Sequence, residues 1–391
     1  MKTNFDAYVP SRILFGAGQL DSLHEQTLPG GKAMIVISNG RSTRANGYLD
    51  RLTTQLERAG VAWAVFDKVE PNPLKSTVQS GAAFARENGC DFIVALGGGS
   101  CMDAAKAMAV VAANGGDYWD YIPSGSGRGL PIEQAPLPIV AITTTAGTGS
   151  EADAGTVVTN ADTHEKTGFV HPGLFPALSI VDPELMLTVP PTFTAYQGFD
   201  ALFHSVEVYV SSEANLMSDM FALTAIQNIA ENLPRAVADG ADLEARTRVA
   251  FANTLSGYAM CVGRCTSEHS LEHALSAYHQ ELPHGAGLIM ISKAYFRHWI
   301  ERGAVPDRFI RMARVMGIPE AKEPMDFIAA LDRLQRECGV AELKMSDYGI
   351  EPSEFATMAD NARDTMGALF AFDRCELSRE DCVEIYRHSF R

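Results

Sequence analysis

Two residues in the stretch "GFDALFHSVEVYVS", residues 198–211, can do chemistry that their neighbours cannot. Asp200 and His204 are four residues apart in a segment built largely from Ala, Leu, Phe, Val and Tyr. In a helix, side chains at i and i+4 lie on one face, so these two converge on one point. Because a buried carboxylate or imidazole is costly unless it is satisfied, each needs a partner. The candidates are each other, another core group, or a metal ion.

A second group of histidines lies in "TSEHSLEHALSAYHQELPHG", residues 266–285. His269 and His273 repeat the i, i+4 spacing, His279 follows, and His284 stands between a proline and a glycine. A lone buried histidine is usually a core residue satisfied by one hydrogen bond. Two helices that each carry such a pair favour a metal site instead. One carboxylate with several imidazoles suits Fe(II), Zn(II) or Mn(II) better than Ca²⁺ or Mg²⁺.

A glycine-rich stretch, "IVALGGGSCMDAAKAMAV" at residues 93–110, has the composition of an anion-binding turn. An apolar strand leads into three glycines and a serine, and a helix with an aspartate in its first turn follows. Glycines let backbone N–H groups approach a phosphate, and the helix N-terminus adds partial positive charge. The alternative is a turn without a ligand, since the stretch matches neither GxGxxG nor a Walker loop. The candidate residues are Gly97, Gly98, Gly99, Ser100 and Asp103.

A second loop of small residues, "TTTAGTGSEAD" at residues 143–153, follows the apolar run "LPIVAI". The candidate hydroxyl donors beside its glycines are those of Thr144, Thr145, Thr148 and Ser150. Alone, such a run is more often a polar turn than a site. Two small-residue loops after two parallel strands suit an extended ligand with phosphates, such as a dinucleotide, because open α/β sheets bind ligands beyond the carboxyl ends of their strands.

Short β-branched runs alternate with amphipathic segments in the first half of the chain, which predicts βαβ units and a parallel sheet. The expected strands are 33–38, 61–67, 91–96, 137–143 and 177–182. After residue 185 strand-like runs nearly vanish and helical periodicity continues to the C-terminus. We therefore predict an α/β Rossmann-like dinucleotide-binding domain over 1–185 and an all-helical domain over 186–391 that binds metal and substrate.

Composition narrows the class of protein further. The chain has 391 residues and a formal net charge of −16, so two domains are expected, and neither nucleic acid nor an anionic membrane is an expected partner. The seven cysteines show no CxxC spacing, which is typical of reduced, mostly buried thiols. The N-terminal stretch "MKTNFDAYVPSR" is unlike a signal peptide, and no apolar run is long enough to span a membrane. We expect a cytoplasmic protein.

Four stretches together resemble the iron-containing, or group III, alcohol dehydrogenases over essentially the whole chain. They are "GGGSCMDAAK", "TTAGTGSE", "GFDALFHSVEVYVS" and "LEHALSAYHQELPHG", in the order and at about the separations that the family has. Any one of them is a weak signal, whereas their joint occurrence is specific. The resemblance implies the α/β plus all-helical fold, a divalent metal, most simply Fe(II), and NAD or NADP as cofactor.

The resemblance also assigns individual residues. It implies that the metal ligands are Asp200, His204, His269 and His284, and that His273 is a histidine near the nicotinamide and substrate that does not bind the metal. The pyrophosphate loop corresponds to Gly97, Gly98, Ser100 and Asp103, and the second cofactor loop to Thr144, Thr145 and Thr148. Lys166 matches a lysine that reaches the cofactor ribose.

The chain departs from the family pattern at two places. Its "HALSAYHQELPHG" is one residue longer than the common family form, so His279 could approach the pocket, although His284 in the matched Pro-His-Gly element is the preferred ligand. After the first predicted strand, Asn39 stands where NAD-using members often carry an aspartate, and Arg41 and Ser42 follow. Loss of that carboxylate permits a 2′-phosphate, so NADP is possible, while an asparagine can also hold the ribose hydroxyl.

The predicted activity is hydride transfer between a nicotinamide and a small alcohol or aldehyde, with the metal as Lewis acid and His273 relaying a proton. A dehydroquinate synthase-like lyase that uses metal and NAD is one alternative, and a non-catalytic metal-binding helical protein is another. The stretch "PSRILFGAG" resembles a strand that the family uses to pair two subunits, which makes a homo-oligomer, a dimer or larger, the expected assembly.

Overall fold

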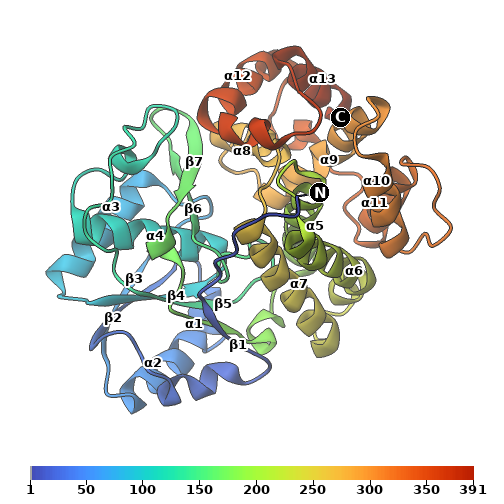
Figure 1. Cartoon of the computed structure of the whole chain (residues 1–391). Coiled ribbons are helices and arrows are strands. Elements are labelled where there is room, and N and C mark those ends of the chain that lie inside the picture. The colour runs from blue at the N-terminus through green and yellow to red at the C-terminus, as the bar shows by residue number, and fades with distance from the viewer. Residues whose placement is uncertain (1) are drawn as a thin grey trace. The chain divides into compact units, whose positions relative to one another are not determined.

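The computed structural model describes residues 2–391 and divides them into two compact units (Figure 1). The α/β unit is Val9–Thr188, and the helical unit joins residues 2–8 to Val189–Arg391. The first residues differ from the predicted division because they pack with helical-unit residues. The Lys2 amide donates to the Ala214 carbonyl at 2.9 Å, and its ammonium pairs with Glu213.

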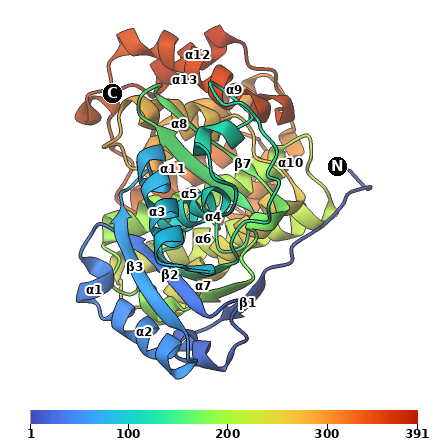
Figure 2. The same cartoon turned by 90° about the vertical axis from the view of Figure 1, so that its left-hand side faces the viewer.

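The α/β unit is built on a six-stranded sheet in which all neighbouring strands are parallel. The spatial order is β1-β8-β5-β4-β2-β3, and Figure 2 shows β2 and β3 side by side at one end. The strands are β1 (Arg12–Phe15), β2 (Lys32–Ser38), β3 (Ala62–Val69), β4 (Phe92–Gly97), β5 (Ile139–Thr143) and β8 (Leu178–Val181). All five predicted strands form, and the structure confirms the predicted fold class.

Helices cover both faces of this sheet. Alternate residues of one strand, such as Met34 and Val36, pack with α3 (Lys75–Glu87) and α4 (Gly99–Asn114), while the residue between them, Ile35, packs with α2 (Tyr48–Arg58). Because a parallel sheet is buried on both faces, its strands are continuous apolar runs and not alternating ones. The remaining short helices are α1 (Ser42–Ala45), η1 (Gln19–Glu25), η2 (Tyr118–Tyr121), η3 (Pro172–Leu174) and η4 (Pro183–Met186).

The sheet has a topological switch point at β2, because the next strand along the chain, β3, lies on one side of β2 and the following strand, β4, lies on the other. Ligands of open α/β sheets bind at such a switch point, outside the carboxyl ends of the strands. The loop after β2 begins at Asn39, and the loop after β4 is the glycine-rich turn, so both predicted cofactor segments leave the sheet here.

A two-stranded antiparallel hairpin was not anticipated. It consists of β6 (Gly155–Asn160) and β7 (Glu165–Val170) and contains Lys166, which is paired across the hairpin with Thr159. The N-terminal strand β1 pairs in parallel with β8 at one edge of the sheet.

The helical unit surrounds one buried helix, α5 (Pro191–Val210), in which residues 198–210 are all buried. It contacts α6, α7 and α9. Among residues 2–391 no helix is both long and apolar enough to cross a membrane. The other helices are α6 (Leu216–Ala238), α7 (Leu243–Val262), α8 (Glu268–Tyr278), α9 (His284–Glu301), α10 (Pro306–Val315), α11 (Asp326–Glu337), α12 (Phe355–Thr365), α13 (Arg379–Ser389), η5 (Met345–Tyr348), η6 (Pro352–Glu354) and η7 (Gly367–Phe372).

A fully buried lysine fastens α4 to the segment that follows β5. The three N–H groups of the Lys106 ammonium face five oxygens: the hydroxyl and carbonyl of Ser150 at 2.8 and 2.9 Å, the carboxylate and carbonyl of Asp153 at 2.8 and 3.0 Å, and the Gly155 carbonyl at 2.8 Å. A buried charge is stable only when such partners replace its water. Lys106 therefore holds the glycine-rich turn and the threonine loop in a fixed relation.

We predict that Lys106→Met lowers the free energy of unfolding by about 3–5 kcal/mol, the usual scale for breaking a buried ion pair by removing one partner. Urea denaturation measures the change. The control is Lys75→Met, whose exposed partner Asp117 is 3.5 Å away and whose loss should cost about 1 kcal/mol or less. Equal losses in the two variants would contradict a structural role for Lys106.

Candidate metal centre and cofactor loops

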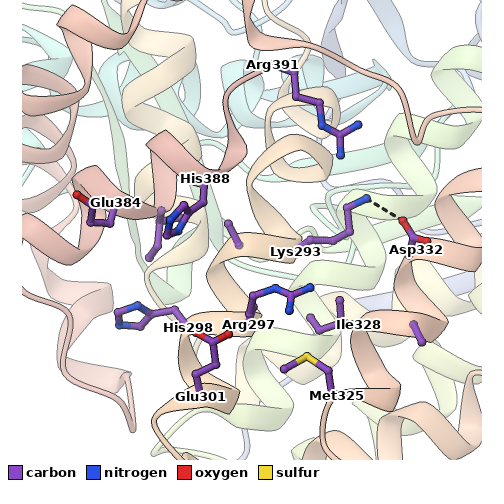
Figure 3. Close-up of a pocket in the computed structure, with 13 residues that line it drawn as sticks. Lys293, Arg297, His298, Glu301, Met325, Ile328, Asp332, Glu384, His388 and Arg391 are labelled. Carbon is purple, nitrogen blue, oxygen red and sulfur yellow. Dashed lines mark hydrogen bonds and ion pairs between the residues drawn. The ribbon is translucent and has the colours of Figure 1, made fainter.

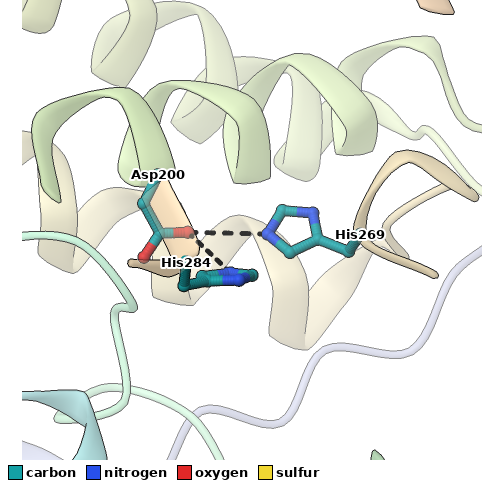
Figure 4. A group of neighbouring side chains, drawn as sticks. All are labelled: Asp200, His269 and His284. Atoms are coloured by element: carbon teal, nitrogen blue, oxygen red, sulfur yellow. Dashed lines mark ion pairs between the residues drawn. The ribbon is translucent and has the colours of Figure 1, made fainter. Parts of the chain in front are cut away.

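Three helices of the helical unit bring the predicted metal ligands together. Helix α5 carries Asp200 and His204, α8 carries His269, and His284 is the first residue of α9. The Nε2 atoms of His269 and His284 each lie 3.5 Å from Oδ1 of Asp200, and Nδ1 of His204 lies 3.3 Å from the same oxygen. Figure 4 shows the imidazoles of His269 and His284 pointing toward the Asp200 carboxylate.

These four side chains are not equivalent. The donor atoms of Asp200, His269 and His284 all lie within 4.8 Å of one another, and His204 does not belong to that group. His204 instead stacks on His269, with ring centroids 4.2 Å apart and an angle of 22° between the rings. The structure thus gathers three of the four predicted ligands around one point and places the fourth directly beside them.

The chemistry of the buried atoms fits a divalent metal. Oδ1 of Asp200 and Nε2 of His269 are buried and have no hydrogen-bond partner within residues 2–391. Buried polar atoms are nearly always satisfied, so two such atoms that face each other call for a ligand. Donors bound at about 2.1 Å to one tetrahedral metal lie roughly 3.4 Å apart. The separations of 3.3–3.5 Å match that value.

The charges at this site are strongly coupled. Although burial opposes it, the imidazoles of His204, His284 and His269 hold the pKa of the Asp200 carboxyl well below its ordinary value. Likewise, against the effect of burial, Glu207 and Asp200 raise the pKa of His269 well above its ordinary value. A buried carboxylate surrounded by imidazoles therefore keeps its negative charge, which is the form that binds a cation.

Two carboxylates that the sequence analysis did not single out stand behind the histidines. Glu207 of α5 is hydrogen-bonded to Nδ1 of His269, and Glu272 of α8 is hydrogen-bonded to Nδ1 of His284. Both glutamates are fully buried. The signal in the sequence was their position inside the two apolar motif stretches, where an unsatisfied carboxylate is costly.

The other two histidines of the second stretch lie in different surroundings. The ring of His273 is buried, with its centroid 5.3 Å from that of His284, and its donor atoms also group with those of Glu272 and His284. His279 ends α8 and interacts with the Glu354 carboxylate through Nε2, at 3.1 and 3.2 Å. His279 therefore points toward a carboxylate of the α12 region and not toward Asp200.

The two predicted cofactor loops of the α/β unit interlock. They follow the neighbouring strands β4 and β5, and the Thr144 amide donates to the Gly97 carbonyl at 3.0 Å. A Cβ added to Gly98 would lie 2.7 Å from the hydroxyl of Thr145, and one on Gly99 would lie 2.3 Å from the methyl of Thr148. The sequence predicts that these glycines make room for a phosphate, and the structure adds a second reason for them, because the side chains of Thr145 and Thr148 occupy the space where a Cβ would lie.

Asp103 lies beneath the glycine-rich turn, and its carboxylate is bound by the protein. It accepts from the Ser150 hydroxyl at 2.8 Å and from the Val157 amide at 3.0 Å. Burial raises its pKa to about 6, against the opposing effect of Lys106. Its contacts are those of a residue that stabilises the conformation of the loop through hydrogen bonds within the protein. Ser100, by comparison, is half-buried in the first turn of α4.

The two remaining predicted cofactor residues differ in exposure. Asn39 is exposed at the carboxyl end of β2, with its amide bonded to the Val69 carbonyl at 2.8 Å, and Arg41 and Ser42 beside it are exposed too. Lys166 is buried in β7, with 5 % of its surface exposed. The loop after β2 is therefore open to a ligand, whereas Lys166 has little surface to offer.

A separate cavity of about 750 Å³ lies between α9, α11 and α13 of the helical unit (Figure 3). Its described lining includes cations such as Lys293 and Arg297 and acids such as Asp332 and Glu301, and the Lys293 ammonium pairs with Asp332 at 2.9 Å. None of the predicted site residues is among the described residues that line it.

Comparison with known proteins identifies the family. The chain matches the model of iron-containing alcohol dehydrogenase over residues 10–183, and the model of the C-terminal part of the Fe-containing alcohol dehydrogenase family over residues 194–390. It is 35% identical to 1,3-propanediol dehydrogenase of Klebsiella pneumoniae, with 99% of each chain covered. It is 31% identical to NAD-dependent methanol dehydrogenase of Bacillus methanolicus, covering 92% of this chain and 93% of the relative.

Comparison with solved structures agrees with this family assignment. The crystal structure of an archaeal halo-thermophilic alcohol dehydrogenase from a Red Sea brine pool is similar with a TM-score of 0.95, 33% identity and complete coverage of both chains. The chain therefore belongs to the iron-containing alcohol dehydrogenase family. The prediction of a metal-dependent, nicotinamide-linked alcohol dehydrogenase is confirmed, whereas the lyase and the non-catalytic protein find no support in these similarities.

We predict that His284→Ala and His204→Ala each lose bound metal, because each removes an imidazole with a nitrogen 3.3–3.5 Å from Oδ1 of Asp200. Elemental analysis of the purified full-length chain measures the retained metal. His279→Ala is the matched control, since His279 faces Glu354, and it should retain metal like the wild type. Full metal content in both test variants would overturn the assignment, and full content in His204→Ala alone would reduce the ligand set to three.

Proposed function

We propose that this chain interconverts small alcohols and aldehydes, with a divalent metal, most simply Fe(II), held by Asp200, His204, His269 and His284. The observation that carries the proposal is the pair of buried, unsatisfied atoms, Oδ1 of Asp200 and Nε2 of His269, at the meeting point of α5, α8 and α9. The substrate class rests on the relatives, which act on 1,3-propanediol and methanol.

When bound, the metal supplies Lewis acidity toward a carbonyl oxygen, and the nicotinamide supplies or accepts the hydride. The chain's own residues position these groups. Asp200 would contribute the one negative charge among the four ligands, so a divalent metal held there with neutral imidazoles would keep a net positive charge from its ligand set. Such a charge would stabilise negative charge on a substrate oxygen.

We propose that the cofactor pyrophosphate lies on the turn formed by Gly97, Gly98, Gly99 and Ser100, at the N-terminus of α4. Backbone amides at a helix start favour an anion there. Thr144, Thr145 and Thr148 would contribute the second wall, and Asp103 would act by holding the turn in shape. Lys166 is proposed to reach the ribose only at its tip, since the rest of the side chain is buried.

NAD and NADP are both compatible with the loop after β2. Asn39 offers an amide where a carboxylate would repel a 2′-phosphate, and Arg41 is exposed two residues later. An asparagine also hydrogen-bonds a ribose hydroxyl. We therefore propose that the chain uses one or both nicotinamide cofactors, with the loop 39–42 setting the preference.

We also propose that the protein works in the cytoplasm as a homo-oligomer. The seven cysteines form no disulfide within the described chain, which suits a reducing compartment. The strand β1 occupies an edge of the sheet, which is the position where a strand of a second subunit can extend it.

An assay tests the proposed activity. The metal-loaded chain should oxidise NADH or NADPH in the presence of short aldehydes, and the reverse reaction should appear with methanol, butanol or 1,3-propanediol. Fe(II), Zn(II) and Mn(II) are compared in parallel, and absorbance of the reduced nicotinamide measures the rate. Arg41→Ala should weaken use of NADPH more than of NADH if the loop binds a 2′-phosphate. No turnover with any aldehyde, metal and cofactor combination would contradict the proposal.

We propose that His273 relays the proton, because its ring lies beside His284 and an imidazole can both accept and donate a proton. His273→Ala should retain metal and cofactor, lower the rate by about 10²-fold or more, and flatten the pH profile near neutral pH. Steady-state kinetics against pH and elemental analysis give the readouts.

Two other outcomes for His273→Ala have distinct meanings. Weaker cofactor binding with an unchanged pH profile would mean that the imidazole only packs against the nicotinamide. Loss of metal would make His273 a ligand, a role that its grouping with Glu272 and His284 also permits.

A further inference from the structure

The two glutamates behind the histidines form a connected arrangement across three helices. Glu207 of α5 contacts His269 of α8, and Glu272 of α8 contacts His284 of α9. In each contact the carboxylate meets Nδ1, while Nε2 of the same ring lies 3.5 Å from Oδ1 of Asp200. Each imidazole is therefore held between a carboxylate on one side and the candidate metal position on the other.

The Glu207 carboxylate is itself fixed in direction. One oxygen meets His269, and the other accepts hydrogen bonds from the amide and the hydroxyl of Thr266, at 2.8 and 3.1 Å. Thr266 lies just before α8, so the same carboxylate sets both the start of that helix and the ring that projects from it. A carboxylate held at both oxygens cannot turn away from the imidazole.

The Glu272 carboxylate is seated against α9 at Gly287. A Cβ added to Gly287 would lie 2.8 Å from both Cγ and Oε1 of Glu272, which is closer than real contacts allow. Glu272 therefore occupies the space that a side chain at residue 287 would take. The glycine lets the carboxylate reach the Nδ1 of His284 one turn earlier on the same helix.

Resting on the metal site of the proposed function, we propose that Glu207 and Glu272 are positioning residues that determine metal affinity. A carboxylate at Nδ1 makes that nitrogen the hydrogen-bond donor, so the lone pair of the neutral ring is on Nε2, facing Asp200. It also adds negative charge near the cation without occupying a coordination position. Loss of such partners typically weakens metal affinity about 10–100-fold.

The test measures the dissociation constant of Zn²⁺ on the metal-stripped full chain, by competition with a chromophoric chelator. Glu272→Ala should weaken Zn²⁺ binding about 10–100-fold. Glu272→Gln should weaken it less, because its amide oxygen still accepts from Nδ1–H while the charge is gone. Glu207→Gln should change it in the same direction as Glu272→Gln.

A second variant tests the position of the Glu272 carboxylate without changing Glu272 itself. Gly287→Ala leaves Glu272 chemically intact but displaces it, and should also weaken Zn²⁺ binding. The matched control is Glu268→Gln, since Glu268 is fully buried next to His269 and neither of its oxygens has a hydrogen-bond partner in residues 2–391. This control should bind Zn²⁺ within twofold of the wild type.

The melting temperature of each metal-free variant separates positioning from folding. A merely structural role would lower that temperature and leave the Zn²⁺ dissociation constant of the folded fraction unchanged. If Glu272→Ala and Gly287→Ala both bind Zn²⁺ with wild-type affinity while His284→Ala loses it, the positioning role of the glutamates is wrong, but the metal site of the proposed function stands. Retention of Zn²⁺ in His284→Ala as well would instead refute the metal site on which the proposed function depends.

Discussion

The structure of the helical unit depends on a negatively charged carboxylate, that of Asp200, buried in an apolar core. Asp200 sits in a helix whose residues 198–210 are all buried, and a carboxylate removed from water costs several kcal/mol unless its surroundings replace the hydration. His204 of the same helix supplies one imidazole, with Nδ1 3.3 Å from Oδ1 of Asp200. The imidazoles of His269 and His284 come from other helices, so α8 and α9 each present their first turn to α5.

That requirement orders the packing outward from one carboxylate. His269 is in the first turn of α8 and His284 is the first residue of α9, which leaves each ring on a short, well-fixed segment. Behind these rings, the Glu207 carboxylate of α5 is hydrogen-bonded to His269 of α8, and the Glu272 carboxylate of α8 is hydrogen-bonded to His284 of α9. The three helices are thus joined by polar contacts inside an apolar core, an arrangement that favours one packing over its alternatives.

Much of the fold and part of the metal site could be predicted from the sequence, because they depend on periodic or local patterns of residues. Apolar runs gave five strands of the sheet, and the i, i+4 spacing placed Asp200 with His204 on one helical face. The hairpin β6–β7 was missed since its strands are partly polar and do not form continuous apolar runs. Glu207 and Glu272 were missed because a glutamate in a helix usually faces water, and although both lie in apolar stretches, the packing of α5, α8 and α9 was needed to show which groups they contact. The environment of Asp103 depended likewise on contacts with residues about fifty positions later.

The interlocking of the two predicted cofactor loops limits how this enzyme could be re-engineered. Because the side chains of Thr145 and Thr148 fill the space above Gly98 and Gly99, neither loop can accept a larger residue unless the other gives up volume at the same time. Substitutions there would have to be made in compensating pairs, and a search of single changes would find few tolerated ones. Asn39, Arg41 and Ser42 at the end of β2 are exposed instead. A search for altered cofactor use should therefore begin there, since an exposed side chain can change with little displacement of its neighbours.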